Sequence, residues 1–471
     1  MTFSTKRYFQ LAGLLCVLLL GMFGHRLWRL ALIGSAYKAK MLCSGVFVSN
    51  RQSKSLLSED LVVDGLSILE YFDTAIDYDA RAVTAGVFGL AQRKAIFREG
   101  LGCTLIIGHS ESRLRGSLGP IEHRASSRSS RQVWLGEEGL STDDIVREVD
   151  TKKLREVVNE AFSEPDPERR RRTRAVVVVY KGQIIAERYA AGFSADTPLL
   201  GWSMTKSVMN ALVGALLEQG RLSLEDQDLW PGWREPNDPR RDISLDQLLR
   251  MTSGLRFDED YDDPLKDVTY MLLGTGDVAG FAADKPLDSE PGIKWSYSSG
   301  TTSILAGILR EVVGGTEADY LAFPRTVLFD RIGMTSAVME PDAAGTFIAS
   351  SFMYATARDW ARLGLLYLRD GVWDGVRIFP DGWVDYTVTP APQAPNSEYG
   401  AHVWLDIPAP FRSNTRPRPS LRQDAYFMAG TEGQLVSIVP SRNLVVVRLG
   451  LSRKEGAWDH DTFLADILEA F

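Results

Sequence analysis

Residues 175–188 read AVVVVYKGQIIAER, and this stretch indicates the fold class. A β-branched run, the turn pair Lys181-Gly182 and a second apolar run follow one another, which predicts a β-hairpin. A matching pair of predicted strands, Gln434–Val439 and Leu444–Leu449, lies near the other end of the chain, and a helix is expected after it from about Asp461 to Ala470. Strands therefore bracket the middle of this sequence.

The middle of the chain is rich in helical patterns. Apolar residues recur at helical spacing in four segments, Ser203–Glu218, Leu245–Met251, Thr301–Val313 and Ala357–Leu368. We expect an α+β fold in which an antiparallel sheet, built from the first and last segments, is flanked by helices and carries an inserted helical lobe.

The length of 471 residues exceeds what one hydrophobic core usually supports. We expect a targeting segment at 1–35, an N-terminal accessory region at 36–150 and the main domain at 151–471. The accessory region mixes short apolar runs, such as Val46–Val48 and Thr104–Ile107, with a helix expected around Ser67–Thr74, which indicates a small α/β region.

The boundary between the accessory region and the main domain is predicted from composition. Arg124–Arg131 reads RASSRSSR, and its Ser and Arg content cannot build a core, which is typical of a linker or surface loop. Asp150 is expected to cap the helix that opens the main domain.

The N-terminus differs from the rest of the chain. After Lys6 and Arg7, the run Phe9–Phe23 is apolar apart from Gln10, which predicts a signal peptide or a membrane anchor, with a buried core helix as the alternative. The protein is accordingly expected to be anchored in the inner membrane facing the periplasm, or exported. Cleavage near Gly34-Ser35-Ala36 and the membrane orientation stay open, because basic residues lie on both sides of the apolar run.

Overall composition excludes some functions. Apolar residues make up 45% of the chain, charged residues 24%, and the formal charge is -8, which argues against nucleic-acid binding and favours a small-molecule partner. The five histidines are scattered singly, so no metal site is expected. Since Cys16 lies in the N-terminal run, Cys43 and Cys103 are the candidates for a disulfide if the protein is exported, with two buried thiols as the alternative.

Ser203 and Lys206 form the first chemically informative pair. They are three residues apart at the start of a predicted helix, so they share a face and the lysine amine can reach the serine hydroxyl. Lysine can accept the serine proton only if its pKa falls from about 10.4 to near 7, a differential of roughly 4 to 5 kcal/mol. The site must therefore be partly desolvated.

Three segments resemble motifs of one enzyme superfamily. Ser203-Met204-Thr205-Lys206 resembles the Ser-Xaa-Xaa-Lys motif of serine β-lactamases and penicillin-binding proteins. Residues 248–255 (LLRMTSGL) are similar to the stretch that follows the nucleophile helix in class C β-lactamases and related esterases and amidases. Residues 291–300 (PGIKWSYSSG) resemble the segment that delivers a tyrosine to the active site, and Tyr297 is the matching residue.

This resemblance implies a β-lactamase/transpeptidase-like fold and a set of site residues. Ser203 would be the acylated nucleophile, and Lys206 and Tyr297 would relay its proton. The backbone N–H groups of Ser203 and Gln434 would form the oxyanion hole. Ser299 and Gly433 would contact the substrate, and no cofactor is implied.

The substrate is expected to differ from a β-lactam. Residues 430–434 (GTEGQ) lack the family's Lys or His, and Ser299 replaces an Asn, so the usual carboxylate and amide contacts are missing. Residues 341–368 most resemble 6-aminohexanoate-dimer-hydrolase-like proteins and carboxylesterases, which implies an amidase or esterase. Asp342, Ser350 and Tyr354 of this stretch are further candidates for the pocket lining.

Three alternatives stay open at this point. The chain could be a non-catalytic, membrane-anchored receptor that keeps the penicillin-binding fold, because residues 430–434 depart from the family's motif. It could be a β-lactamase or a D-Ala-D-Ala carboxypeptidase. A Ser-His-Asp hydrolase using His402 or His460 is a weaker alternative, since no Gly-Xaa-Ser-Xaa-Gly elbow stands out.

Overall fold

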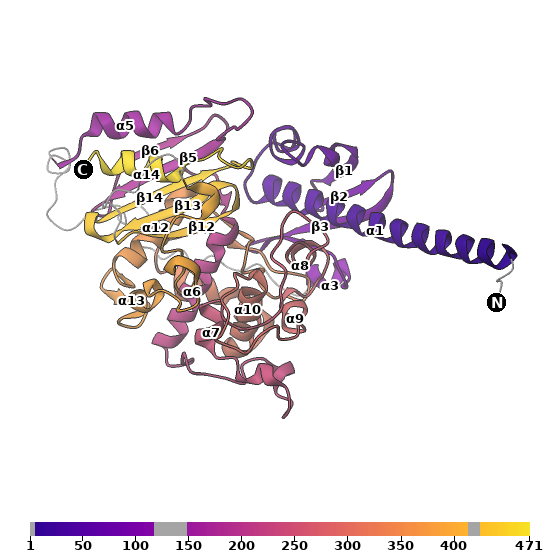
Figure 1. Cartoon of the computed structure of the whole chain (residues 1–471). Helices are drawn as coiled ribbons and strands as arrows, with labels where there is room; N and C mark the ends of the chain where they lie inside the picture. Colours follow the sequence, from indigo (N-terminus) through magenta and orange to yellow (C-terminus); the bar gives the residue numbers. More distant parts are fainter. Residues whose placement is uncertain (1–4, 117–147, 413–423) are drawn as a thin grey trace.

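The computed structural model describes residues 5–116, 148–412 and 424–471 (Figure 1). The linker predicted at Arg124–Arg131 lies outside these ranges. The described chain forms an N-terminal module, residues 5–116, and a main domain, residues 148–471, that contains the central sheet and the helical lobe.

The central sheet of the main domain is antiparallel and has the strand order β12-β13-β14-β5-β6. Its strands are β5 (Thr173–Tyr180), β6 (Gln183–Tyr189), β12 (Tyr426–Gly430), β13 (Gln434–Val439) and β14 (Leu444–Gly450). Strand β14 pairs with β5, so the two ends of the domain meet in the middle of the sheet. The two predicted hairpins are confirmed, and β12 is an additional edge strand.

Helices cover both faces of this sheet (Figure 1). Helices α5 (Thr151–Glu160) and α14 (His460–Leu468) contribute to the core cluster that contains Val176 and Val178, while α12 (Ala357–Leu368) lies in the cluster that contains Val177 and Val179. The run of valines in β5 is thereby explained, because a strand buried on both faces needs apolar residues at every position. Asp150 caps α5 as predicted, since its carboxylate accepts from the amide of Lys153.

The helical lobe is inserted between β6 and β12, as the sequence predicted. Its helices are α6 (Thr205–Glu218), α7 (Leu245–Leu249), α8 (Asp267–Leu273), α9 (Val278–Ala283), α10 (Ser299–Val313), α11 (Glu317–Pro324) and α13 (Trp383–Val388). Two small sheets accompany it, one formed by β7 (Leu199–Leu200), β9 (Met353–Ala355) and β8 (Val338–Met339), the other by β10 (Val372–Trp373) and β11 (Val376–Arg377).

The N-terminal module packs a long helix on a four-stranded antiparallel sheet. Its elements are α1 (Thr5–Phe47), α2 (Ser53–Ser55), β1 (Phe72–Asp77), β2 (Ala82–Val87), β3 (Leu90–Arg98), β4 (Gly102–Leu105) and α3 (Glu111–Gly116). The helix predicted around Ser67–Thr74 was wrong in part, because a 3₁₀ turn over Ser67–Tyr71 leads directly into β1. Val46 likewise belongs to the end of α1 and not to a strand.

Helix α1 also bears on the predicted membrane segment. Its N-terminal half projects away from the body of the protein, whereas its C-terminal half is packed, with Ser35, Ala36 and Lys40 buried (Figure 1). Among the described residues, none of the helices combines the length and apolar character needed to span a bilayer. The predicted boundary at residue 35 falls inside this continuous helix.

The close contact of α12 with the sheet gives a stability prediction. A Cβ atom on Gly364 would lie 2.7 Å from Val445 Cγ1 and 2.9 Å from Val436 Cγ1. We expect Gly364→Ala to lower the free energy of unfolding by about 1–3 kcal/mol, because the well-packed layer cannot absorb the extra atom. Urea unfolding followed by tryptophan fluorescence would measure this change.

Gly24→Ala is the matched control. Gly24 also lies in a helix, and no atom lies within 4 Å of its added Cβ. The same glycine-to-alanine change should therefore leave stability unchanged or raise it slightly. Equal effects of the two substitutions would contradict the packing argument.

Candidate active site

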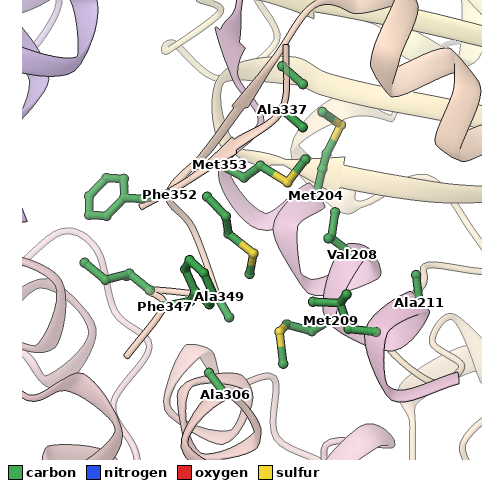
Figure 2. Close-up of a cluster of buried hydrophobic side chains, with 14 of the residues drawn as sticks. Met204, Val208, Met209, Ala211, Ala306, Ala337, Phe347, Ala349, Phe352 and Met353 are labelled. Atoms are coloured by element: carbon green, nitrogen blue, oxygen red, sulfur yellow. The ribbon is translucent and has the colours of Figure 1, made fainter. Parts of the chain in front are cut away.

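Ser203 lies in a 3₁₀ turn, Trp202–Met204, that leads into α6. Gly201 permits this turn to pack tightly, because a Cβ there would lie 2.3 Å from Trp360 Cζ2, and its amide donates to the carbonyl of Met353. Figure 2 shows the apolar side chains that surround this end of α6, including Met204, Val208 and Met353. Ser203 is thus held by close packing just before the beginning of α6.

Lys206 is placed to interact with Ser203. Its Nζ lies 3.2 Å from Ser203 Oγ, 3.0 Å from Ser299 Oγ and 3.1 Å from the carbonyl oxygen of Ser350. The side chain is buried, and burial lowers its pKa to about 8, while the negative charge of Glu259 acts in the opposite direction. A substantial fraction of Lys206 is therefore neutral near pH 8 and able to accept a proton.

Tyr297 completes the group. Its ring lies 4.8 Å from Lys206 Nζ, and it packs edge-on against Tyr399, with a centroid separation of 5.8 Å. Burial raises the pKa of the Tyr297 hydroxyl, Glu259 raises it further, and a hydrogen bond with Ser203 acts against both. The phenol therefore stays protonated near neutral pH and can pass a proton on, but it is unsuited to act as a phenolate base.

Ser299 connects this group to a residue that the sequence analysis missed. The Ser299 amide donates to Glu259 Oε2 at 2.8 Å, and its hydroxyl lies 2.5 Å from Glu259 Oε1. Its hydroxyl is thus shared between Lys206 and Glu259, and a direct contact of Ser299 with substrate stays a prediction. The acidic stretch 258–263 (DEDYDD) was the available sequence signal for Glu259.

The edge strand β12 lies against Ser203. A Cβ atom on Gly430 would lie 2.2 Å from the carbonyl oxygen of Gly201 and 3.1 Å from the amide nitrogen of Ser203. Phe427 exchanges both backbone hydrogen bonds with Trp404 on the free side of β12, so Ala429, two residues further on, directs its amide to the same side. The Ala429 amide is therefore not used in the β12–β13 ladder.

Gln434 and Gly433 also make structural contacts, and their predicted roles in the site stay predictions. Gln434 pairs with Gly430 within the β12–β13 ladder, and its side chain bonds the backbone of Gly450. Gly433 has a φ of +81°, and a Cβ there would lie 2.3 Å from Arg448 Nη1. Its lack of a side chain thus makes room for Arg448, and Gly430 is the glycine that approaches Ser203.

The histidines do not form a triad with Ser203. His402 is buried, and burial together with the positive charge of Lys206 lowers its pKa to about 3, so it stays neutral. His460 lies at the start of α14, with Nε2 2.7 Å from Ser437 Oγ, in the core cluster on the other face of the sheet. Within the described ranges, no three His, Cys, Asp or Glu side chains gather in a metal-binding arrangement.

An open depression adjoins the catalytic group. It has a volume of about 540 Å³ and lies next to Ser296 and Glu259; the other residues that line it are Arg256, Phe257, Asp258, Asp260, Leu265, Lys266 and Asp267. Glu259 accepts from neutral donors only, namely Ser299 and the Tyr261 hydroxyl at 2.8 Å, so its charge is not neutralised by these bonds. Four carboxylates line this depression, and of these Asp258 is paired with Lys266 and Asp267 with Lys285.

Comparisons with known proteins agree with this geometry. The beta-lactamase family model matches residues 146–466, and the chain belongs to that family. It is 29% identical over 236 residues to a 6-aminohexanoate-dimer hydrolase from Paenarthrobacter ureafaciens, a match that covers 45% of this chain and 56% of that protein. The matched part thus spans little more than half of that relative.

Solved structures show the same fold. A putative 6-aminohexanoate-dimer hydrolase from Bacillus anthracis is similar with a TM-score of 0.53 and 23% identity, over 68% of this chain and 84% of that one. A putative beta-lactamase from Bacteroides dorei is similar with a TM-score of 0.53 and 16% identity, over 68% of this chain and 99% of that one.

The pKa of Lys206 predicts how reactivity depends on pH. The rate at which Ser203 reacts with a fluorophosphonate should rise through a midpoint of about pH 8, because only neutral Lys206 accepts the serine proton. Glu259→Gln removes a negative charge that stabilises the protonated amine, so the midpoint should move to lower pH. Labelling rates measured from pH 6 to 10 test both statements, and a midpoint that moves to higher pH in Glu259→Gln would contradict them.

Proposed function

We propose that this protein is a serine hydrolase that cleaves an amide or ester bond through an acyl-enzyme on Ser203. The observation that carries the proposal is the buried Lys206 amine, 3.2 Å from the Ser203 hydroxyl and with its pKa lowered to about 8. A non-catalytic receptor has no need of a desolvated lysine, which costs free energy to bury.

The proposed reaction has two stages. Ser203 Oγ attacks the substrate carbonyl while neutral Lys206 takes its proton, and the amides of Ser203 and Ala429 hold the oxyanion. Lys206 and Tyr297 pass the proton to the leaving amine or alcohol as the carbonyl–heteroatom bond breaks. Water then attacks the acyl-enzyme, gives a proton back through the same groups to Ser203 and releases the carboxylic acid.

Mass spectrometry of the intact protein tests the nucleophile. Full-length protein exposed to a fluorophosphonate should gain one adduct, and Ser203→Ala should gain none, because the attacking oxygen is gone. Ser207→Ala is the matched control, since Ser207 lies on the same helix and its hydroxyl bonds the His402 carbonyl, away from Lys206. If the folded wild-type protein does not react with the fluorophosphonate, the non-catalytic receptor is favoured. If the protein is exposed to a penicillin and gains a stable penicilloyl adduct, peptidoglycan-like substrates are favoured.

We further propose that the substrate is an amide or ester that carries a free amino group. The carboxylates that line the depression around Glu259 support this, since a cationic group is attracted to them and a carboxylate is repelled. The relative named 6-aminohexanoate-dimer hydrolase is consistent with a substrate of this type.

A pair of chromogenic substrates tests this preference. The p-nitroanilide of 6-aminohexanoic acid should have a kcat/KM about tenfold above that of its N-acetylated form, which corresponds to ~1.4 kcal/mol. Glu259→Gln should reduce this ratio, and the ratio cancels any effect of the substitution on Lys206. Equal kcat/KM values for the two substrates in the wild-type protein would rule out recognition of the amino group.

A further inference from the structure

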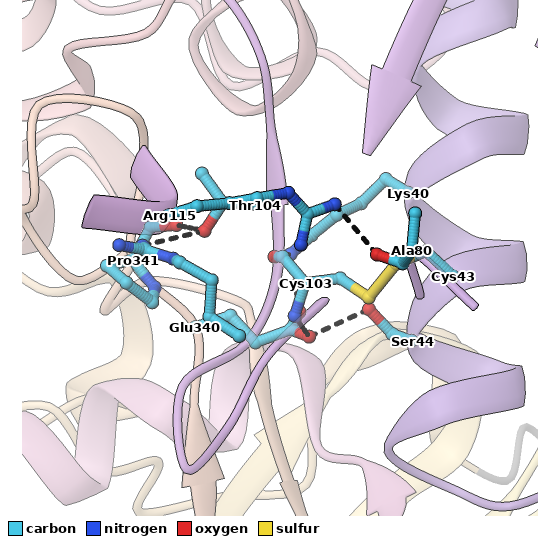
Figure 3. Close-up of a disulfide and its surroundings, with 10 residues drawn as sticks. Lys40, Cys43, Ser44, Ala80, Cys103, Thr104, Arg115, Glu340 and Pro341 are labelled. Carbon is cyan, nitrogen blue, oxygen red and sulfur yellow. Dashed lines mark hydrogen bonds and ion pairs between the residues drawn. A yellow bond between two sulfur atoms is a disulfide. The ribbon is translucent and has the colours of Figure 1, made fainter. Parts of the chain in front are cut away.

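The carboxylate of Glu340 joins the main domain to the N-terminal module (Figure 3). It is fully buried, and it accepts hydrogen bonds from Lys40 Nζ at 2.5 Å, Ser44 Oγ at 2.7 Å and the amide of Cys103 at 2.7 Å. These three donors all belong to the N-terminal module. A charge of the main domain is thus compensated by a segment that precedes that domain in the chain.

The disulfide between Cys43 and Cys103 holds these donors in place. It ties α1 to β4 with a Cα–Cα distance of 6.1 Å, and Lys40 lies one helical turn before Cys43. Lys40 Nζ also donates to the carbonyl of Cys103. The next residue of β4, Thr104, donates from its hydroxyl to the carbonyl of Pro341 at 2.9 Å. Helix α1, strand β4 and the disulfide together form the site that binds the Glu340 carboxylate.

Glu340 is the first residue of a loop that reaches the catalytic lysine. In this Glu340 loop, residues 340–352, the Glu340 amide donates to the carbonyl of Phe352 at 2.9 Å, which closes the loop at its base. Ser350 lies inside it, and its carbonyl oxygen is the acceptor 3.1 Å from Lys206 Nζ. Displacement of the loop would therefore remove one of the contacts that orient the Lys206 amine.

The base of the Glu340 loop also touches the residue before the nucleophile. The ring of Phe352 lies 4.7 Å from Lys40 Nζ and 5.8 Å from the ring of Trp202. Lys40 therefore contacts both the first residue of the loop, Glu340, and the last, Phe352. The N-terminal module reaches the surroundings of Lys206 and of Ser203 by one continuous set of packed groups.

We propose that the N-terminal module is a positioning element of the active site, in which Lys40 acts through Glu340 to hold the loop whose Ser350 carbonyl orients Lys206. The inference rests on the proposed hydrolase function for its activity readout. Lys40 is a positioning residue, because its side chain contacts Glu340, Cys103 and Phe352 and acts on Lys206 only through the loop. Loss of its charge leaves the Glu340 carboxylate buried beside an apolar side chain, which the loop relieves by moving toward water.

Two buried lysines on the same helix give a matched comparison. Lys38 and Lys40 are both buried on α1, but Lys38 donates to the carbonyls of Leu69 and Phe72 inside the module. In full-length protein, Lys40→Met should slow fluorophosphonate labelling of Ser203 roughly ten- to hundredfold, the effect expected when a catalytic group is misplaced by about 1 Å. Lys38→Met should label at nearly the wild-type rate when both variants are assayed well below their melting temperatures.

Two further readouts separate positioning from general loss of stability. Water admitted beside Lys206 relieves the desolvation that lowers its pKa, so the pH profile of labelling should move to higher pH in Lys40→Met and stay in place in Lys38→Met. The double variant Lys40→Met/Glu340→Gln removes both charges, and it should recover labelling relative to Lys40→Met alone, because a neutral amide can still accept from Ser44 and Cys103.

Hydrogen–deuterium exchange tests the inference without any activity. Amides within residues 340–355 should exchange faster in Lys40→Met than in the wild-type protein or in Lys38→Met. Unchanged exchange there, or equal slowing of labelling by the two lysine substitutions, would overturn the inference. If the wild-type protein is not labelled at all, the hydrolase proposal fails, whereas the exchange comparison still decides whether Lys40 holds the Glu340 loop.

Discussion

The exclusion of water from Lys206 is the constraint on which the rest of this structure depends. A lysine amine in water holds its proton at neutral pH and cannot activate a serine, so the fold must surround the amine with protein while leaving the hydroxyl accessible. Three neighbours from separate parts of the lobe, Ser203, Ser299 and Ser350, supply neutral oxygen atoms around it. The carboxylate of Glu259 lies on the far side of Ser299 from Lys206. It raises the pKa of Lys206 and so partly offsets the lowering by burial, without forming an ion pair with the amine.

Much of the main domain could be predicted because its strong patterns are local. The valine run of β5, the turn pair after it and the spacing of apolar residues in α12 each lie within a few residues of sequence, and each was placed correctly. Strand β12 was missed because its five residues carry no flanking turn of their own and depend on pairing with β13 and Trp404. The sequence analysis therefore named Gln434 of β13 and did not consider Ala429 of β12.

The catalytic group was predictable in part for a similar reason. Ser203 and Lys206 are three residues apart where a 3₁₀ turn leads into α6, whereas Glu259 is linked to them by its hydrogen bonds with Ser299, a contact between residues 40 positions apart. The role of Glu340 was still less accessible, since its partners Lys40 and Cys103 lie 300 and 237 positions away. Buried polar contacts of this range leave no periodic signal in a sequence, because a single residue is enough to make each of them.

The pairing of β14 with β5 has a consequence for the synthesis of this protein. Strand β5 is synthesised before the helical lobe, but its neighbour β14 is synthesised only after that lobe. Contacts of such long sequence separation form slowly, since the entropy of closing a long loop must be overcome first. The nascent chain therefore carries Ser203 and Lys206 without the strand β12 that lies against Ser203 until the whole helical lobe has been made.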